Sequence, residues 1–367
     1  MSLHVNFAYF HDDAPPGGAV DAFRRRVVRP VKRCRGARAA PDAAPADSRG
    51  LQIGGREATE LEVAELEQVW AELALVPSPA GTPDGTVGTR TPRISVIVPT
   101  FNEAKNLPHV FGRIPADVHE VIVVDGHSVD GTIETAVSLR NDVRIVLQNR
   151  KGKGNAMACG FAAATGDVVV MLDADGSADP LEIPRFVAAL VGGADFAKGT
   201  RFREGGGSND ITRVRAWGNR WLNRIANLLF GTPYTDLCYG YNAFWRHSLD
   251  RLELDPRHGV SGGRLWGDGF EIETIINTRV AKAGLRITEV PSYEYSRLHG
   301  LSNLNTWRDG GRVLRALLVE RFNGKATPRR HHFAGNVVAG AFGWWARGDP
   351  SPGLSAGTGA RVDGGRR

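Results

Sequence analysis

Two carboxylates, Asp173 and Asp175, stand one residue apart directly after the apolar run 168–172. A short, β-branched run of this kind is typical of a strand in a parallel sheet that is covered on both faces. Carboxylate oxygens are the ligands that Mg²⁺ or Mn²⁺ prefers, and such a cation usually keeps waters and substrate phosphates as further ligands. An Asp-x-Asp pair alone is weak evidence, because such pairs also cap helices and occur in loops. At the end of a buried strand it favours a cation that neutralises a leaving diphosphate.

Polar loops also follow the first two apolar runs of the chain. Pro99, Phe101 and Glu103 come after residues 94–98, and Asp125 ends the second run. Ligands of open parallel sheets bind beyond the carboxyl ends of the strands, so we expect these loops to meet the aspartate pair at one edge. No GxGxxG or GxxxxGK[ST] motif follows the first run. That absence argues against a dinucleotide dehydrogenase and against a phosphate loop.

The spacing of apolar residues predicts the elements that position these loops. Strands alternating with helices indicate βαβ units, hence an α/β domain with a mainly parallel central sheet flanked by helices. Strands are expected at 94–98, 121–125, 143–147 and 168–172, and helices at 102–113, 131–140 and 154–164.

Three ordered motifs then identify a family. The segments VIVPTFNEAKNL, VIVVDGHSVDGT and KGKGNAMACGFAAATGDVVVMLDADGSADP resemble the family 2 glycosyltransferases of the GT-A (Rossmann-like) fold, over roughly residues 94–322. That family transfers a sugar from a nucleotide sugar with inversion at the anomeric carbon. The resemblance implies two sets of donor ligands: Pro99, Phe101, Glu103 and Asp125 for the nucleoside, and Asp173 with Asp175 for the divalent cation and the diphosphate. Lys153 precedes a helix whose N-terminus can face a diphosphate, so we expect it to contact the donor.

The downstream part resembles the polyprenyl-phosphate sugar transferases of the dolichyl-phosphate mannose synthase type. The segment 198–201 is similar to their Gly-Ser-Arg motif, and Arg297-x-x-Gly-x-Ser302 matches a later one. The resemblance implies that Arg201 and Arg297 grip the phosphate of the acceptor, with Ser302 beside them. A lipid monophosphate is already an anion, so it needs positioning more than deprotonation, and arginine offers it two parallel donors. The alternative for each arginine is an ordinary ion pair.

Three positions depart from the pattern of that subgroup. Ser177 stands where an amide-bearing residue is common, and Tyr239 and Asn242 replace a serine and an arginine of the acceptor loop. These departures keep open a soluble alcohol as the acceptor, which would need a general base. Asp268 is the candidate base, although at a helix start it could instead be the N-cap. Glu271 and Glu273 follow, but residues two apart diverge on a helix, so at most one points into the site.

The most direct interpretation is an inverting, metal-dependent hexosyltransferase that uses a GDP-mannose or UDP-glucose type donor and a polyprenyl phosphate. A catalytically dead nucleotide-sugar-binding protein is the alternative from another class. A degenerate site would be expected to lose a metal carboxylate, and this chain keeps both. The sugar and the nucleotide cannot be read from the motifs.

The distribution of charge limits the partners of the 367-residue chain. Residues 24–38 contain eight Arg or Lys and no acid, the C-terminal 45 residues are basic, and the segment 39–322 between them is net acidic. The folded body therefore lacks the net positive charge expected of a protein that binds nucleic acid. The basic ends of the chain suit an anionic membrane surface. The three cysteines are far apart and offer no zinc spacing. We expect a cytoplasmic protein, at most peripheral at the inner face of a membrane.

The domain boundaries follow from composition. Residues 1–92 are expected to be a mostly disordered extension with one helix at 57–74, residues 93–322 the glycosyltransferase domain, and residues 323–367 a basic Gly/Pro-rich tail. The amphipathic segment 307–322 is expected to be a helix that either docks on the core or lies in the headgroup layer of a membrane.

Overall fold

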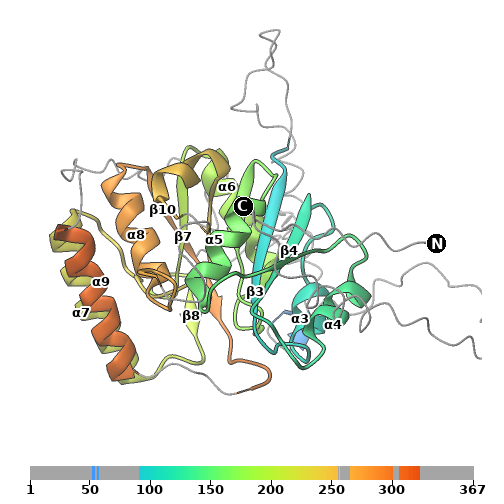
Figure 1. Ribbon diagram of the computed structural model, residues 1–367. Coiled ribbons are helices and arrows are strands. Elements are labelled where there is room, and N and C mark those ends of the chain that lie inside the picture. The colour runs from blue at the N-terminus through green and yellow to red at the C-terminus, as the bar shows by residue number, and fades with distance from the viewer. Residues whose placement is uncertain are drawn as a thin grey trace, which may run out of the picture.

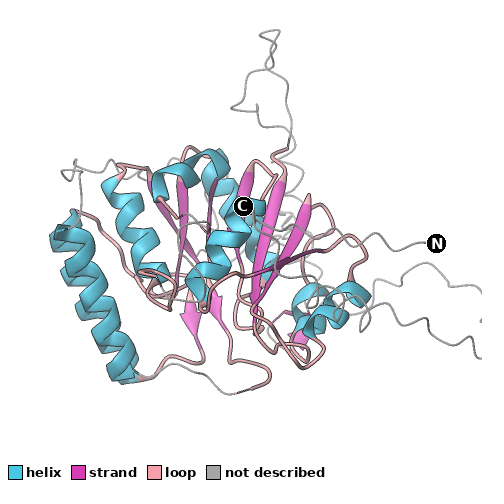
Figure 2. Ribbon diagram, in the orientation of Figure 1, coloured by secondary structure: helices cyan, strands magenta, loops and turns pink. Residues whose placement is uncertain are grey.

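The computed structural model describes residues 52–53, 56–57, 91–254, 256, 265–300 and 306–322. Apart from Glu57, the expected helix at 57–74 lies outside these residues, as do Ser302 and the tail 323–367. The described chain forms a central seven-stranded sheet with helices on both faces (Figure 1, Figure 2). The predicted α/β class and the mainly parallel sheet are confirmed.

The four predicted strands are neighbours in that sheet. They form β3 (Ile94–Thr100), β4 (Glu120–Asp125), β5 (Arg144–Leu147) and β6 (Val168–Met171), which pair in parallel in the order β6-β3-β4-β5. All four carboxyl ends therefore lie at the same edge of the sheet.

The other three strands extend the sheet beyond β6. They are β7 (Phe196–Thr200), β9 (Asn242–Trp245) and β10 (Ile287–Pro291). The complete order is β10-β7-β9-β6-β3-β4-β5, and β9 is antiparallel to both of its neighbours. Two-residue strands pair outside this sheet: β1 (Gln52–Ile53) with β2 (Arg56–Glu57), and β8 (Gly207–Ser208) with β11 (Tyr293–Glu294).

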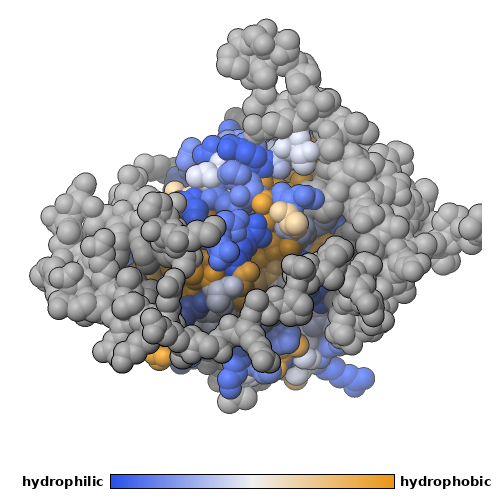
Figure 3. Space-filling model, turned by 90° about the vertical axis from the view of Figure 1, so that its right-hand side faces the viewer, coloured by the Kyte–Doolittle hydropathy of each residue, from blue (hydrophilic) through white to orange (hydrophobic). Residues whose placement is uncertain are grey.

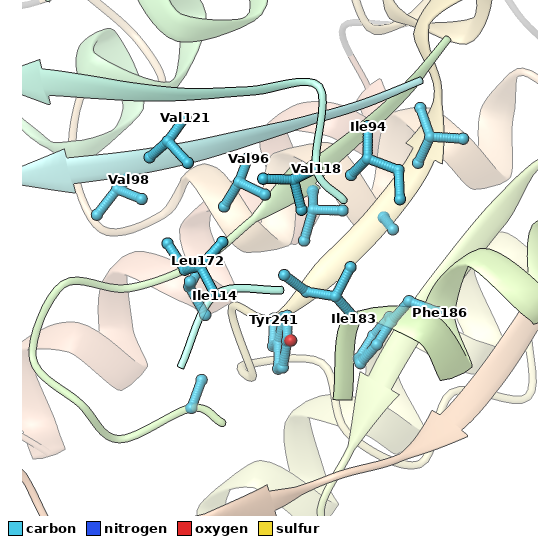
Figure 4. Close-up of a cluster of buried hydrophobic side chains, with 14 of the residues drawn as sticks. Ile94, Val96, Val98, Ile114, Val118, Val121, Leu172, Ile183, Phe186 and Tyr241 are labelled. Atoms are coloured by element: carbon cyan, nitrogen blue, oxygen red, sulfur yellow. The ribbon is translucent and has the colours of Figure 1, made fainter. Parts of the chain in front are cut away.

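Alternating side chains of the strands bury two hydrophobic cores. Val96 and Val98 of β3 point into one core, and Ile97 between them points into the other. The first core contains side chains of α3 (Leu107–Phe111), α4 (Thr132–Leu139) and α6 (Ile183–Val191), which follows the 3-10 turn η1 (Pro180–Glu182). Figure 4 shows its centre, where Val96 and Val98 face Ile183, Phe186 and Tyr241.

The second core lies under the remaining helices. These are α5 (Lys153–Ala163), α7 (Arg213–Phe230), α8 (Ile272–Lys282) and α9 (Thr306–Phe322), with the 3-10 segment η2 (Arg246–Leu252) beside α8. Helices α7 and α9 pack against each other at one end of the molecule, and α3 and α4 lie near the other end (Figure 1). From the β5 edge, the described surface mixes hydrophilic and apolar side chains (Figure 3). None of the described helices combines the length and the apolar character needed to cross a membrane.

Candidate active site

The polar loops after β3, β4 and β6 meet at the carboxyl edge of the sheet. Thr100 of β3 is in register with Asp125 of β4, and the backbone N–H of Leu172 donates to the carbonyl of Ile97, which continues the pairing of β6 with β3. The parallel register thus brings Asp125 and the Asp173–Asp175 pair to the same edge, as expected from the sequence.

Asp125 is fully buried and joins two of the loops. Its carboxylate accepts hydrogen bonds from the backbone N–H of Ser128 at 2.8 Å, from the Ser128 hydroxyl at 2.6 Å and from the Thr100 hydroxyl at 3.1 Å. Ser128 in turn accepts from the backbone N–H of Asn102 at 2.8 Å. Phe101, next along the chain, is 62% exposed, so one face of this edge is open to a flat ligand.

Arg297 bridges two of the predicted donor carboxylates. Its Nη2 donates to Glu103 Oε1 at 2.9 Å and its Nε donates to Asp175 Oδ2 at 3.3 Å. Burial raises the pKa of Glu103, and hydrogen bonds from Asn106 and Arg297 only partly oppose this shift. A residue predicted for the acceptor phosphate therefore lies in direct contact with the donor side of the edge.

The other metal carboxylate, Asp173, is paired with Lys153. The ammonium lies 2.6 Å from Asp173 Oδ1 and 2.7 Å from Oε1 of Glu273, at the start of α8. Burial alone would lower the pKa of Lys153, but attraction to Asp173 and Glu273 outweighs it and raises the pKa. The lysine is therefore held in its charged form beside the aspartate pair.

The aspartate pair fits a hard divalent cation that shares its ligands with a substrate. Among the described residues there is no group of three or more His, Cys, Asp or Glu side chains that could hold a metal. The side chains of Asp173 and Asp175 remain 35% and 20% exposed, so each carboxylate can reach a ligand in solution. Two carboxylates, with water and diphosphate oxygens as the remaining ligands, suit Mg²⁺ or Mn²⁺.

Arg201, the second predicted phosphate ligand, lies in a buried ion-pair network. Its Nε and Nη2 donate to the two oxygens of Asp236 at 2.7 and 2.9 Å, and its Nη1 donates to Glu294 at 2.8 Å. The guanidinium also lies 5.0 Å from the centre of the Tyr239 ring, and the side chain is only 9% exposed. The ordinary ion pair, the alternative considered for this arginine, is present in the structure.

Three asparagines of α7 hold the loop that carries Asp236. Asn219, Asn223 and Asn227 are spaced four residues apart, so they lie on one face of the helix. Asn227 accepts from the backbone N–H of Tyr234 and donates to its carbonyl, both at 2.9 Å. Asn223 donates to the carbonyl of Thr235 and accepts from the N–H of Leu237, and Asn219 donates to Asp236 itself. We call Asn219, Asn223 and Asn227 the asparagine ladder.

Asp268, the candidate general base, is buried against Arg150. Its two oxygens accept from the Arg150 guanidinium, each at 2.9 Å, and Oδ2 also accepts from the backbone N–H of Leu265. The N-cap interpretation is wrong, because α8 begins at Ile272 and Glu271 precedes it. Of the two glutamates that follow, Glu273 is the one that points toward the aspartate pair, through Lys153.

The positions that depart from the subgroup pattern all have local structural partners. The backbone N–H of Ser177 donates to Asp175 Oδ1 at 3.0 Å, so this residue shapes the turn after β6. The Tyr239 hydroxyl lies 2.9 Å from the Ser292 hydroxyl. Asn242 is fully buried in β9 and donates to the carbonyl of Gly240.

Two surface stripes occur on the helices at the other end of the molecule. Helix α7 was not predicted from the sequence. Its exposed side includes four apolar residues: Val214, Trp217, Trp221 and Leu228. The side chain of Trp217 is 59% exposed and that of Leu228 is 86% exposed. Helical spacing puts these residues opposite the asparagine ladder. The helix carries four arginines and no acidic residue.

Helix α9 docks on the core, as one of the two expectations for the segment 307–322 proposed. Val313 and Leu317 are buried in the second core, so the helix docks. Leu314, Leu318 and Phe322 are four residues apart and exposed, so a second apolar stripe faces solvent.

The order of the strands and the helices on both faces are those of the GT-A fold. The chain belongs to glycosyltransferase family 2: the profile described as "Glycosyl transferase family 2" matches residues 95–253. The resemblance seen in the sequence is thereby confirmed.

Two of the curated relatives have names that combine mannose with a polyprenol phosphate. The polyprenol monophosphomannose synthase of Mycolicibacterium smegmatis is 31% identical over 226 residues, covering 59% of this chain and 82% of that protein. The undecaprenyl-phosphate mannosyltransferase of Micrococcus luteus is 33% identical over 225 residues, covering 58% and 88%.

Solved structures share the fold at lower identity. The glucosyl-3-phosphoglycerate synthase of Mycobacterium tuberculosis, crystallised with Mn²⁺, UDP and phosphoglyceric acid, superposes with a TM-score of 0.50 and 24% identity, covering 71% of this chain and 82% of that one. At this level the likeness supports the architecture alone.

Proposed function

We propose that this glycosyltransferase moves a hexose from a nucleotide sugar to a polyprenyl phosphate at a membrane surface. The observation that carries the proposal is the position of Arg297, whose guanidinium contacts Glu103 and Asp175 together. A phosphate held by this arginine would lie beside the carboxylates that serve the donor. The names of the relatives from Mycolicibacterium smegmatis and Micrococcus luteus support the same acceptor class.

The donor is proposed to bind across the carboxyl ends of β3, β4 and β6. Phe101 and Pro99 would contact the nucleoside, with Glu103 as its polar partner, while the buried Asp125 would hold the loop beside it. A divalent cation bound by Asp173 and Asp175 would neutralise charge on the departing diphosphate. Lys153 is proposed to supply a further positive charge there. The donor is of the GDP-mannose or UDP-glucose type, and the mannosyl names of the relatives favour the first.

Transfer with inversion needs an acceptor oxygen on the opposite side of the anomeric carbon from the diphosphate. A phosphate oxygen of the acceptor forms the new bond to that carbon while the bond to the diphosphate oxygen breaks, and the electron pair leaves with the diphosphate. A phosphate oxygen is already an anion, so no side chain has to remove a proton, and the protein contributes mainly position. An alcohol acceptor would need Asp268 as its general base, but both oxygens of Asp268 accept hydrogen bonds from Arg150. This pairing supports a phosphate acceptor rather than an alcohol.

The exposed stripes of α7 and α9 are proposed to lie in the headgroup layer of an anionic membrane. Tryptophan is favoured where one side of the ring is apolar and the other is wet. The arginines of α7, with no acidic residue among them, complement anionic lipids. Such contact would make the enzyme a peripheral protein at the cytoplasmic face, where the lipid acceptor is presented.

The transfer assay offers GDP-mannose and UDP-glucose, each with a polyprenyl phosphate or a panel of soluble alcohols, with Mn²⁺ or with EDTA. We expect product only with the polyprenyl phosphate and only with the cation. Transfer only to an alcohol would overturn the acceptor proposal. Donor binding without any transfer would favour the dead-enzyme alternative.

The membrane proposal is tested by vesicle flotation. The double variant Trp217→Ser/Trp221→Ser should release the protein from anionic vesicles, and raised salt should weaken the binding of the unchanged chain. Leu139→Ser, a change at an exposed residue of α4, is the matched control and should bind normally. Equal binding of both variants would contradict a docking role for α7.

A further inference from the structure

Lys153 is shared between the metal carboxylate Asp173 and the buried carboxylate Glu273. Its ammonium lies 2.6 Å from Asp173 Oδ1 and 2.7 Å from Glu273 Oε1. The side chains of Lys153 and Glu273 are only 15% and 9% exposed, whereas that of Asp173 is 35% exposed. Glu273 therefore faces the protein side of the lysine, and Asp173 faces the open side.

The backbone around this trio leaves the ammonium little room. The N–H of Gly154 donates to the carbonyl of Asp268 at 2.9 Å, and a Cβ on Gly154 would come within 1.7 Å of the Gly267 carbonyl oxygen. The start of α5 is thus clamped to the turn before α8. A Cβ on Gly240 would lie 3.2 to 3.3 Å from the charged atoms of Lys153, Asp173 and Glu273, so this glycine closes the remaining side.

Two cations cannot both use Asp173 at close range without repelling each other. A divalent cation on Asp173 carries twice the charge of the ammonium and so would displace it from that carboxylate. The Lys153 side chain is only 15% exposed, so leaving its ammonium without a partner would be costly. Glu273 supplies the partner at a distance of 2.7 Å without any movement of the backbone.

We infer that Glu273 is a positioning residue: it retains Lys153 when a divalent cation takes Asp173, and it keeps the ammonium beside the leaving diphosphate. The inference rests on the proposed function, because it needs a cation and a diphosphate at this edge. Neither the sequence motifs nor the family resemblance drew attention to this pairing. Glu273 lies 120 residues from Lys153 in the chain, and no spacing rule joins them.

The test measures binding rather than turnover. Mn²⁺ affinity without nucleotide is followed by electron paramagnetic resonance of the free ion, and GDP and UDP affinity with saturating Mn²⁺ by calorimetry. Lys153→Met removes the competitor, so Mn²⁺ alone should bind more tightly, while the nucleotide diphosphate should bind about tenfold more weakly. Glu273→Gln leaves Lys153 with Asp173 alone, so Mn²⁺ should bind several-fold more weakly.

The double variant Lys153→Met/Glu273→Gln separates positioning from a merely structural role. Without the lysine, the glutamate has nothing to retain, so Mn²⁺ affinity should return to that of Lys153→Met. Glu273→Asp should restore part of the loss. Lys151→Met and Glu271→Gln remove the same charges from neighbouring positions and should leave Mn²⁺ affinity unchanged. Near-UV circular dichroism verifies that each variant is folded.

Two outcomes would overturn the inference. One is unchanged Mn²⁺ affinity in Glu273→Gln. The other is a double variant that binds Mn²⁺ no better than Glu273→Gln does. Failure of the proposed function looks different, because the unchanged protein would then bind neither Mn²⁺ nor a nucleotide, and both proposals would fall together.

Discussion

Two regions of the site hold their charges in different ways: the edge with Asp173 and Asp175 that is proposed to bind the donor (the donor edge), and the region around Arg201 and Asp236 that is predicted to bind the acceptor (the acceptor side). At the donor edge, Asp173 and Asp175 are partly exposed, and each has a basic partner that a ligand could replace, Lys153 or Arg297. On the acceptor side, Asp236 is fully buried, and Arg201 uses Nε and both Nη atoms on carboxylates. In the first arrangement the carboxylates can exchange their basic partners for a ligand during a reaction cycle. The second arrangement suits a rigid part of the site whose ion pairs stay in place.

The largest effect that would test this contrast is on stability. Asp236→Asn should lower the free energy of unfolding by about 3 kcal/mol, because it removes the fully buried one of the two carboxylates that pair with Arg201. Chemical denaturation measures the loss. Asp195→Asn breaks the more exposed pair with Arg286 and should cost less than about 1 kcal/mol. Equal losses for the two variants would show that the acceptor side is no more rigidly held than the surface.

The donor edge should respond in activity rather than in stability. Asp175→Asn should reduce the transfer rate about 10²–10³-fold, since charge on the leaving group is then poorly compensated. The free energy of unfolding should change by no more than about 0.5 kcal/mol, as for other exposed sites. Asp142→Asn, at a surface pair with Arg140, is the control for both measurements. A full transfer rate in EDTA, or in Asp175→Asn, would contradict the exchange of partners proposed for this edge.

A pH titration sharpens the picture of the acceptor side, because Glu182 accepts a hydrogen bond from Ser292, whose hydroxyl lies beside that of Tyr239. Burial raises the pKa of Glu182 to about 7, although Arg185 and Ser292 oppose the shift. Between about pH 4.5 and pH 7 the unfolded chain loses this proton and the folded chain keeps it, so stability should fall as the pH rises and level off above pH 7. Glu182→Gln should remove this fall, which amounts to at most about 3 kcal/mol.

Glu120 provides the internal control for that titration. Burial would raise its pKa, but hydrogen bonds from Ser95, Thr165 and Arg144 outweigh it and lower the pKa to about 2. Its contribution is present above about pH 4.5 and is lost as the pH falls toward 2. Glu182→Gln should keep this acid loss. Stability of the unchanged protein that stays level between pH 5 and pH 7 would refute the assignment to Glu182.

The smallest predicted effect concerns the residue that joins the two sides. Arg297→Lys keeps the charge but cannot make the two-pronged contact, so the KM for polyprenyl phosphate should rise about tenfold. The midpoint of unfolding should stay unchanged. Arg286→Lys, on the surface, is the control. An unchanged KM would mean that Arg297 binds only the carboxylates Glu103 and Asp175 and does not contact the acceptor phosphate.

The sequence predicted the donor half of the fold well, because its signals are local. Each of the four expected strands is a continuous apolar run, and each is present within two residues of its predicted ends. The helix expected from residue 102 begins only at Leu107. The reason is that Asn102 has a positive φ of 57°, and the backbone N–H groups of Asn102 and Ala104 donate to Ser128 and Asp130 of the loop after β4, which holds this segment in a non-helical path.

The acceptor side could not be predicted in the same way. Its contacts join residues far apart in sequence, such as Arg201 with Glu294, and no periodic pattern records such a pair. Helix α7 was overlooked because two of its four buried residues, Asn219 and Asn223, are polar, and because apolar residues also occupy its exposed side, so its sequence shows no single apolar face. The roles of the donor and acceptor residues themselves remain predictions.

The asparagine ladder has a consequence for how this protein can change over evolutionary time. Asn227 pairs with both backbone polar groups of Tyr234, much as a neighbouring strand would. The path of the loop through Leu237 is therefore fixed by amides that bind its backbone, and by Asn277, which donates to the Leu237 carbonyl. Side chains along the loop can be exchanged while that path persists. Substitutions along this loop can thus accumulate, and acceptor preference can diverge, without a new scaffold.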